Sequence, residues 1–368
     1  MKRKDLFNKM GIGLMAVLGL AIMVLTGGFF AVRWHLTDVG GIVDGHSAEL
    51  RALADRITEI RQDAGPADRI NICKAFAIGE FSGTNAQHVV DAYDRTRSGE
   101  LLANMVAAIT VRLDDRSNAL YQGKMKHCED GSGIDRERER AKWNMSAPNV
   151  FVWMNTEDWN TFKAATVKDK EVVARVAGET GVEPRMIVAQ LVAEQLRLFN
   201  SDREVYKQFF APLKILGSET KFSLGVTGVK EETAIEIENN LKDAHSSYYP
   251  GPQYEHMLDF KTGDVAAERY DRITNEHDHY YAYLYTALYL KEIEQQWKND
   301  GYDIAHRPEI LSTLFNIGFK HSKPNATPET GGAMIEIAGE QYSFGSLGYE
   351  FYYSGEMMDE FPYGSEVK

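Results

Sequence analysis

Residues 172–195 constrain the fold most, because they predict two helices joined by a tight turn. Gly181 supplies the stop for the first helix, since glycine enters the left-handed conformation without a steric penalty at Cβ. Pro184 suits the first turn of the second helix, where its missing N–H removes no hydrogen bond. Glu194 follows an apolar stripe near the end of that helix, where a half-buried carboxyl group can act as an acid; a solvated glutamate is the simpler interpretation of this position alone. The stripe has helical spacing and predicts a face packed in a core: Ile187, Val188, Leu191 and Val192.

Helical patterns prevail along the rest of the chain, and strand-like alternation is scarce, so the expected fold class is mainly α. A net charge of -13 argues against nucleic acid as the main partner, because phosphate backbones attract basic surfaces.

The apolar residues of 265–298 predict one long helix, and shorter helices are predicted over 230–241 and 307–319. Three tyrosines of the long helix are assigned to the core in preference to a platform for sugar: Tyr281, Tyr285 and Tyr289.

The N-terminus predicts a membrane anchor. Residues 11–32 form an apolar run that is long enough to span a bilayer. Basic residues in the preceding tail, residues 1–10, keep that tail in the cytoplasm and place the rest of the chain on the other side of the membrane. A cleaved signal peptide is the alternative, but the run is longer than a usual signal core and no small-x-small cleavage site follows it.

Residues 38–142 predict a helical N-terminal region that ends in a linker. The segment 38–64 has the spacing of a short amphipathic helix, which suits a stalk or a dimer contact. The polar, glycine-broken segment 129–142 is the best candidate for a linker. Cys73 and Cys128 either form one disulfide, as an exported protein allows, or remain as buried thiols. Their spacing does not indicate a zinc site.

Residues 147–368, a domain with a C-terminal extension, contain a series of motifs in a fixed order. In that order they resemble the lytic transglycosylases and goose-type lysozymes, which share the lysozyme-like fold. The resemblance covers about residues 165–320 and places Glu194 on the catalytic glutamate of that family. The motifs that carry it are Gly181-Val-Glu-Pro184, the helix ending in Glu194, the glycine loop from Ser223 to Thr233-Ala234, Tyr289-Leu290, and Phe315-Asn316-Ile317-Gly318.

The resemblance implies cleavage of the MurNAc-GlcNAc β-1,4 bond of peptidoglycan, with Glu194 as the general acid and then the base, and with no cofactor. Lytic transglycosylases need no second carboxylate, because the N-acetyl group of the substrate assists and its 6-hydroxyl closes a 1,6-anhydro ring. An inverting lysozyme would need a second carboxylate to activate water. Three acidic residues are available for that role: Asp202, Glu204 and Glu219.

The resemblance also implies a substrate cleft lined by the glycine loop, where glycine lets a sugar approach closely. Asn316 either binds the substrate or holds a loop. The implied location is the bacterial inner membrane, single-pass, with the C-terminal domain in the periplasm beside the glycan strands, and an envelope protein complex is a further candidate partner. The predicted substrate-binding residues are Ser223, Gly225, Thr227, Gly228 and Asn316.

Two departures from the family pattern keep other functions open. Gln195 replaces the serine after the glutamate, and Thr227-Gly228 replaces a Met-Gln pair whose glutamine contacts sugar. A catalytically inactive lysozyme-like scaffold that binds glycan or an envelope complex is therefore one alternative. The tail after Gly332 is rich in aromatic residues and glycines, which would permit it to close over the cleft.

A metalloenzyme is the second alternative, because Glu276-His277-Asp278-His279 is dense in metal ligands and His245 and His256 precede it. On a helix, however, alternate residues point about 200° apart, so His277 and His279 would not share a metal there.

Overall fold

The computed structural model describes residues 23, 43, 64–129, 147–199 and 225–364. The predicted anchor and stalk lie almost entirely outside these ranges, as do most of the predicted linker, Ser223 and the three candidate second carboxylates. Within the described ranges, no helix combines the length and the apolar composition needed to cross a bilayer. The membrane anchor therefore stays a prediction.

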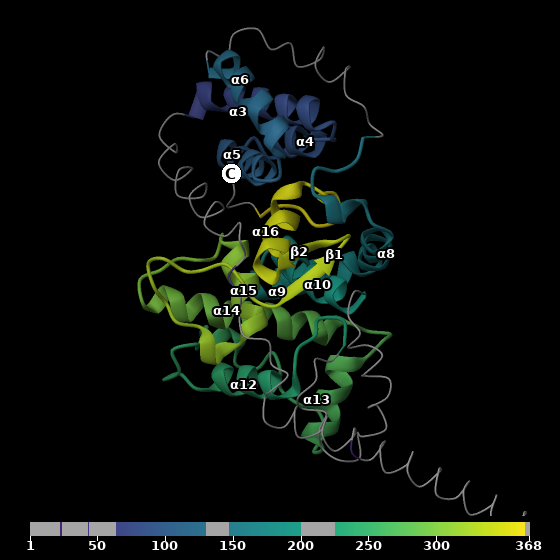
Figure 1. The fold of residues 1–368 in the computed structure, drawn as a ribbon. Helices are drawn as coiled ribbons and strands as arrows, with labels where there is room; N and C mark the ends of the chain where they lie inside the picture. The colour runs from purple at the N-terminus through teal and green to yellow at the C-terminus, as the bar shows by residue number, and fades with distance from the viewer. Residues whose placement is uncertain (1–22, 24–42, 44–63, 130–146, 200–224, 365–368) are drawn as a thin grey trace, which may run out of the picture.

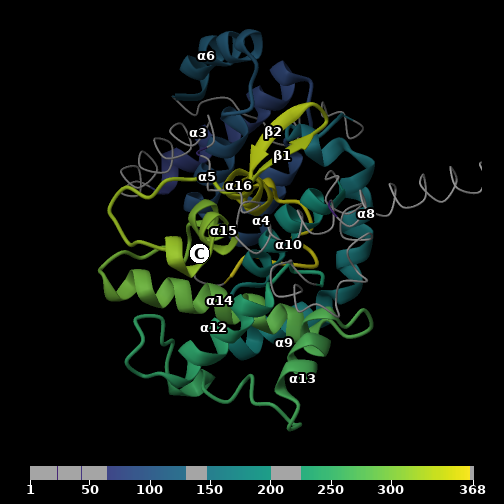
Figure 2. The same ribbon diagram turned by 60° about the horizontal axis from the view of Figure 1, so that its bottom comes forward.

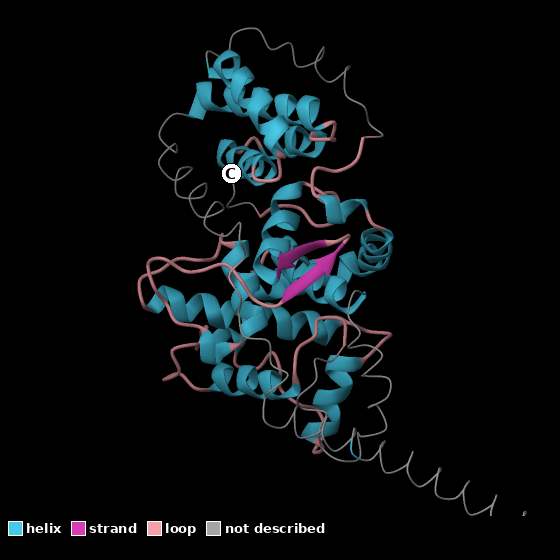
Figure 3. Cartoon of the chain, viewed as in Figure 1, coloured by secondary structure: helices cyan, strands magenta, loops and turns pink. Residues whose placement is uncertain are grey.

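The described part of the chain is mainly helical, which confirms the expected fold class (Figure 3). The helices are α3 (Ala64–Ser82), α4 (Gln87–Thr96), α5 (Gly99–Thr110), α6 (Asp115–Glu129), α8 (Glu157–Thr166), α9 (Lys170–Thr180), α10 (Pro184–Phe199), α12 (Glu231–Lys242), α13 (Val265–Thr274), α14 (Tyr280–Asn299), α15 (Pro308–Ile317) and α16 (Phe344–Ser354). Short 3-10 helices are η1 (Val152–Asn155), η2 (Val167–Asp169), η5 (Pro252–Tyr254) and η6 (Phe319–His321), and the strands are β1 (Met334–Ile337) and β2 (Glu340–Ser343).

The helices are arranged along one long axis of the molecule. Helices α3–α6 lie at one end, α12 and α13 lie at the other, and α10, α15, α16 and the strands lie between them (Figures 1 and 2). One continuous set of buried apolar side chains runs from Ile72 in α3 to Phe361 near the end of the chain. The N-terminal helices thus share their core with the rest of the described chain.

The helix pair at the centre of the sequence forms as its local pattern predicts. Gly181 has a positive φ of 71° and its N–H donates to the Ala177 carbonyl at 2.8 Å, which ends α9. Pro184 begins α10. Every residue from Arg185 to Glu194 is buried. The apolar stripe alone would leave a polar face on α10, so this burial shows that other elements cover the helix on all sides over these residues.

The C-terminal segment forms core structure, which corrects the interpretation of this region as a tail. All residues of α16 are buried, and α16 packs against α15, α10 and α5. Its close approach to α15 depends on two glycines, because a Cβ at Gly345 or Gly348 would overlap Thr313 or Ser312. The aromatic residues and glycines of this segment are therefore packing residues.

Arg185 attaches the end of α16 to the start of α10. Its guanidinium is fully buried and donates to the carbonyls of Phe351 at 2.6 Å, Tyr352 at 2.8 Å and Glu356 at 2.7 Å. A planar fork with five N–H donors suits several carbonyls at once. This contact positions α10, and with it the helix end that carries Glu194.

A β-hairpin, β1 and β2, precedes α16. The strands are antiparallel, and Ala338 and Gly339 join them with φ angles of 54° and 83°. Two consecutive positive φ angles are typical of a type I′ turn, whose twist matches that of the flanking strands. Each strand has four residues. So short an alternation gives little signal in the sequence.

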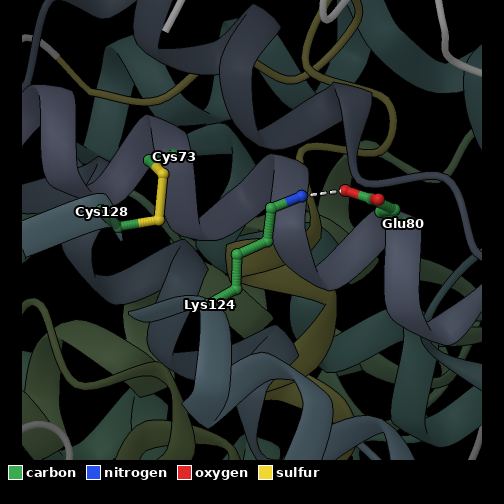
Figure 4. Close-up of a disulfide and its surroundings, with 4 residues drawn as sticks. All are labelled: Cys73, Glu80, Lys124 and Cys128. Atoms are coloured by element: carbon green, nitrogen blue, oxygen red, sulfur yellow. Dashed lines mark hydrogen bonds and ion pairs between the residues drawn. A yellow bond between two sulfur atoms is a disulfide. The ribbon is translucent and has the colours of Figure 1, made fainter. Parts of the chain in front are cut away.

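Cys73 and Cys128 form a disulfide that joins α3 to α6, with 5.5 Å between their Cα atoms (Figure 4). The Lys124–Glu80 ion pair lies beside it on the same two helices. Helices α5 and α4 of the same end of the molecule pack against α16, and Arg112 follows α5. Arg112 pairs with the buried Glu350 of α16.

Residues 275–279 break the predicted long helix into α13 and α14. The Asn275 side-chain oxygen accepts from the N–H groups of His277 at 2.9 Å and Asp278 at 3.1 Å, and Asp278 accepts from Tyr280 N–H at 3.0 Å. These short polar side chains satisfy the local backbone in a turn, which competes with continuation of the helix. In α14 itself, Tyr285 and Tyr289 are buried as predicted and Tyr281 is partly buried.

Candidate functional site

Glu194 lies near the C-terminal end of α10 and is buried, with 3% of its surface exposed. Its Oε1 is ion-paired with Arg197, which follows three residues later on the same helix and is itself largely buried. Residues three apart share a helix face, so this pairing is a local consequence of the sequence. A cation near a helix C-terminus also interacts favourably with the helix dipole.

The turn at residues 225–228 brings the glycine loop to Glu194. Gly225 and Gly228 have positive φ angles of 62° and 66°, which favour glycine at both positions. A Cβ at Gly228 would overlap the carboxyl group of Glu194, and a Cβ at Gly225 would overlap the carbonyl oxygen of Ile273 in α13. The expected close approach of a sugar to this loop is therefore replaced, at Gly225 and Gly228, by contacts with the protein itself.

Gln195 holds this turn on α10, because its Nε2 donates to the Val226 carbonyl at 2.6 Å. Gln195 is the residue that stands where the resembling family has serine. Between the two glycines, Thr227 is fully buried, and its hydroxyl has no hydrogen-bond partner among the described residues. A buried hydroxyl without a partner is unusual and carries a free-energy cost.

Asn316 holds a loop on the side of the hairpin. At the end of α15, its side-chain oxygen accepts from Ala333 N–H at 2.8 Å. Gly332, the residue before Ala333, has a φ of 100°. A Cβ at Gly332 would lie 3.0 Å from the Asn316 side-chain oxygen and 2.9 Å from the Phe344 Cβ. Of the two roles considered for Asn316, the described contacts favour loop-holding.

The predicted residues that the structure describes thus fall into two groups, and a cation–π contact lies between them. Glu194, Thr227 and Gly228 belong to the α10 side, and Asn316 belongs to the hairpin side. The Arg197 guanidinium lies 6.0 Å from the centroid of the Phe344 ring, which connects the two groups. Sequence reasoning missed Arg197, although its spacing from Glu194 was a usable signal.

The histidine-rich segment forms an ion pair with Asp169, the last residue of η2, instead of a metal cluster. His279 Nδ1 lies 2.6 Å from Asp169 Oδ2, and the Tyr283 hydroxyl donates to the same oxygen at 2.5 Å. The hydrogen bond to Asp169 raises the pKa of His279. Among the described residues, no group of three or more histidine, cysteine or acidic side chains is arranged to hold a metal ion.

No protein-family model, no curated protein and no solved structure matches this chain. The functional interpretation therefore depends on the residues themselves.

Proposed function

We propose that this protein is a membrane-anchored, peptidoglycan-cleaving enzyme of the lytic transglycosylase type, with Glu194 as its general acid and base. One observation carries the proposal: the Glu194 carboxyl group lies against the Gly228 backbone, in a turn that Gln195 fixes to the same helix. These residues belong to two motifs that are more than thirty positions apart in the sequence. A buried acid next to a glycine turn is the arrangement that the resemblance implies.

In the proposed reaction, Glu194 donates its proton to the glycosidic oxygen between MurNAc and GlcNAc as the bond from that oxygen to C1 of MurNAc breaks. The N-acetyl group of the same sugar stabilises the positive charge that develops at C1. The 6-hydroxyl of MurNAc then attacks C1 and returns its proton to the Glu194 carboxylate. The products are a 1,6-anhydro end and a new GlcNAc 4-hydroxyl, with no water consumed, so a single carboxyl group serves both steps.

The predicted anchor at residues 11–32 supports a place beside the peptidoglycan. It would hold the domain at the periplasmic face of a bacterial inner membrane and so limit the strands within reach. An envelope protein complex remains a proposed partner.

The experiment digests purified peptidoglycan with the full-length protein in a non-ionic detergent and identifies products by mass spectrometry. Glu194→Gln tests the acid, and Glu179→Gln serves as a matched control, because Glu179 pairs with Arg175 at an exposed position on α9. We expect anhydro-muropeptides from the parent and from Glu179→Gln, and none from Glu194→Gln. Reducing-end products would instead indicate a hydrolase, in which a second carboxylate activates water.

A catalytically inactive scaffold is the second candidate, and the Glu194–Arg197 ion pair favours it. A buried carboxylate already bonded to a guanidinium has to exchange that partner before it can donate a proton. The glycine at position 228 also offers no side chain to a sugar, unlike the glutamine of the resembling family. Glycan binding that is equal in the parent and Glu194→Gln, with no product from either folded protein, would establish the scaffold.

A further inference from the structure

Glu292, on α14, is the exception among the buried glutamates of the described chain. It is fully buried, yet it forms no ion pair with any basic side chain in the part of the chain that the structure describes. A buried carboxylate is normally paired with a cationic side chain or bound to a metal ion, because an isolated charge is costly to remove from water. The other buried glutamates are each paired with an arginine: Glu194 with Arg197, Glu238 with Arg269, Glu309 with Arg307, and Glu350 with Arg112.

The Glu292 carboxyl group is held by one oxygen and unpartnered at the other. Its Oε2 accepts from Asn240 Nδ2 of α12 at 3.0 Å, and its Oε1 has no hydrogen-bond partner among the described residues. Tyr289 lies three residues earlier on the same face of α14. Its hydroxyl is buried and makes no full hydrogen bond within the described ranges, and the Phe319 N–H has only a small effect on its pKa. Two buried oxygens on one helix face thus lack partners.

Glu236 brings a second carboxyl group to the same place. It lies one turn before Asn240 on α12, which packs against α14 (Figure 1). Burial raises the pKa of Glu292 well above its usual range, and the charge of Glu236 adds to the rise. Burial and then the charge of Glu236 likewise raise the pKa of Tyr289. Burial also raises the pKa of Glu236 itself, and the exposed Lys320 opposes this rise. Glu236 therefore lies close enough to act on both groups of α14.

We propose that Glu292, Glu236 and the Tyr289 hydroxyl bind one calcium ion between α12 and α14. Carboxylate and hydroxyl oxygens suit calcium and magnesium better than zinc or copper. Calcium accepts irregular sets of oxygen ligands, whereas magnesium gives up its water reluctantly and so suits a buried site less well. The two charges of the ion balance the two carboxylates. The site lies on other helices than Glu194 and does not depend on the proposed enzyme activity.

The test titrates Ca²⁺ and Mg²⁺ by calorimetry into the full-length protein in a non-ionic detergent, after a chelator has removed bound metal. Repeating the titration in two neutral buffers with different ionisation enthalpies measures the protons released. Glu292→Gln and Glu236→Gln each remove one carboxylate. Glu294→Gln is the matched control, because Glu294 lies on the same helix but pairs with Lys291 at 3.2 Å. Near-ultraviolet circular dichroism checks the fold of each variant.

We expect the parent and Glu294→Gln to bind Ca²⁺ and to release about one proton per ion, because Glu292 is neutral before the ion binds. Glu292→Gln should weaken calcium binding by about tenfold or more and should abolish the proton release, since a lost ligand costs at least as much as a lost outer partner. Glu236→Gln should weaken binding to a similar extent. Tb³⁺, which replaces Ca²⁺, should luminesce through the tyrosine beside it, and Tyr289→Phe should reduce this emission.

The absence of calcium binding by the parent would overturn the inference and leave Glu292 as a neutral buried acid. Binding that is unchanged in both Glu292→Gln and Glu236→Gln would place the ion elsewhere and would overturn it equally. Tighter binding of Mg²⁺ than of Ca²⁺ would overturn the assignment to calcium. None of these measurements uses peptidoglycan, so the result is independent of the proposed function.

Discussion

Replacing Gly228 with alanine tests the contact on which the candidate site depends. The added methyl group would overlap the Glu194 carboxyl group, and the backbone φ of 66° would hold alanine in the left-handed region. Gly181 offers a matched control with a φ of 71°, because a Cβ there would meet no atom within 4 Å. The two substitutions therefore share the conformational penalty and differ in the contact with Glu194.

The expected losses in the free energy of unfolding follow from the left-handed conformation and from the overlap with Glu194. An alanine in the left-handed conformation costs about 1–2 kcal/mol, which is the whole effect expected for Gly181→Ala. Overpacking against a fixed neighbour adds about 1–3 kcal/mol. Gly228→Ala should therefore lower the free energy of unfolding by about 2–5 kcal/mol in total. Removing the neighbour with Glu194→Ala should recover about 1–3 kcal/mol of that loss in the double variant.

The assay is urea unfolding of the full-length protein in a non-ionic detergent with its disulfide intact, for the parent, the two glycine variants, Glu194→Ala and the Gly228→Ala/Glu194→Ala double variant. A double-mutant cycle then isolates the interaction between positions 228 and 194. Equal costs for Gly228→Ala and Gly181→Ala, together with additive effects in the cycle, would refute the placement of the Glu194 carboxyl group against the turn. The candidate site would then have to be abandoned.

Three further predictions concern groups outside the site. Burial raises the pKa of Glu292 well above its ordinary value of 4.5, so its contribution to stability is complete below pH 4.5 and is lost as the pH rises toward the folded-state pKa. Glu292→Gln should thus increase the urea midpoint at about pH 8 and change it little at about pH 4. The same shift in midpoint, relative to the parent, at both pH values would contradict this prediction. The hydrogen bond to Asp169 raises the pKa of His279 above 6.5, so the pair stabilises the protein fully below pH 6.5 and less as the pH rises through the raised pKa. His279→Gln should therefore flatten the dependence of the free energy of unfolding on pH over that interval. The same pH dependence in the parent and the variant would count against the pair. The disulfide between Cys73 and Cys128 closes a loop with a sequence separation of 55 residues, so replacing both with serine should cost about 4 kcal/mol in urea unfolding by the chain-entropy estimate, whereas an unchanged midpoint would show that the bridge adds nothing.

The sequence alone predicted the features that depend on residues within one or two helical turns. Gly181 and Pro184 define the joint between α9 and α10 because helix ends are set by local backbone conformation. The ion pair between Glu194 and Arg197 was equally readable from their spacing, although it was missed. The predicted long helix over 265–298 failed where local side-chain hydrogen bonds to the backbone competed with the helix.

Tertiary structure decided which distant segments meet. Gln195 contacts the Val226 carbonyl, and Gly228 receives the Glu194 carboxyl group, across a sequence separation that no periodicity encodes. The burial of α16 likewise depends on the two glycines that let it approach α15, and on Arg185, which satisfies the carbonyls at its end. Local propensity acts within a few residues. Burial, in contrast, stabilises any apolar surfaces that fit together, however far apart they are in the chain. The sequence therefore determined the helices and their ends, and packing between distant segments placed the candidate acid against its glycine turn.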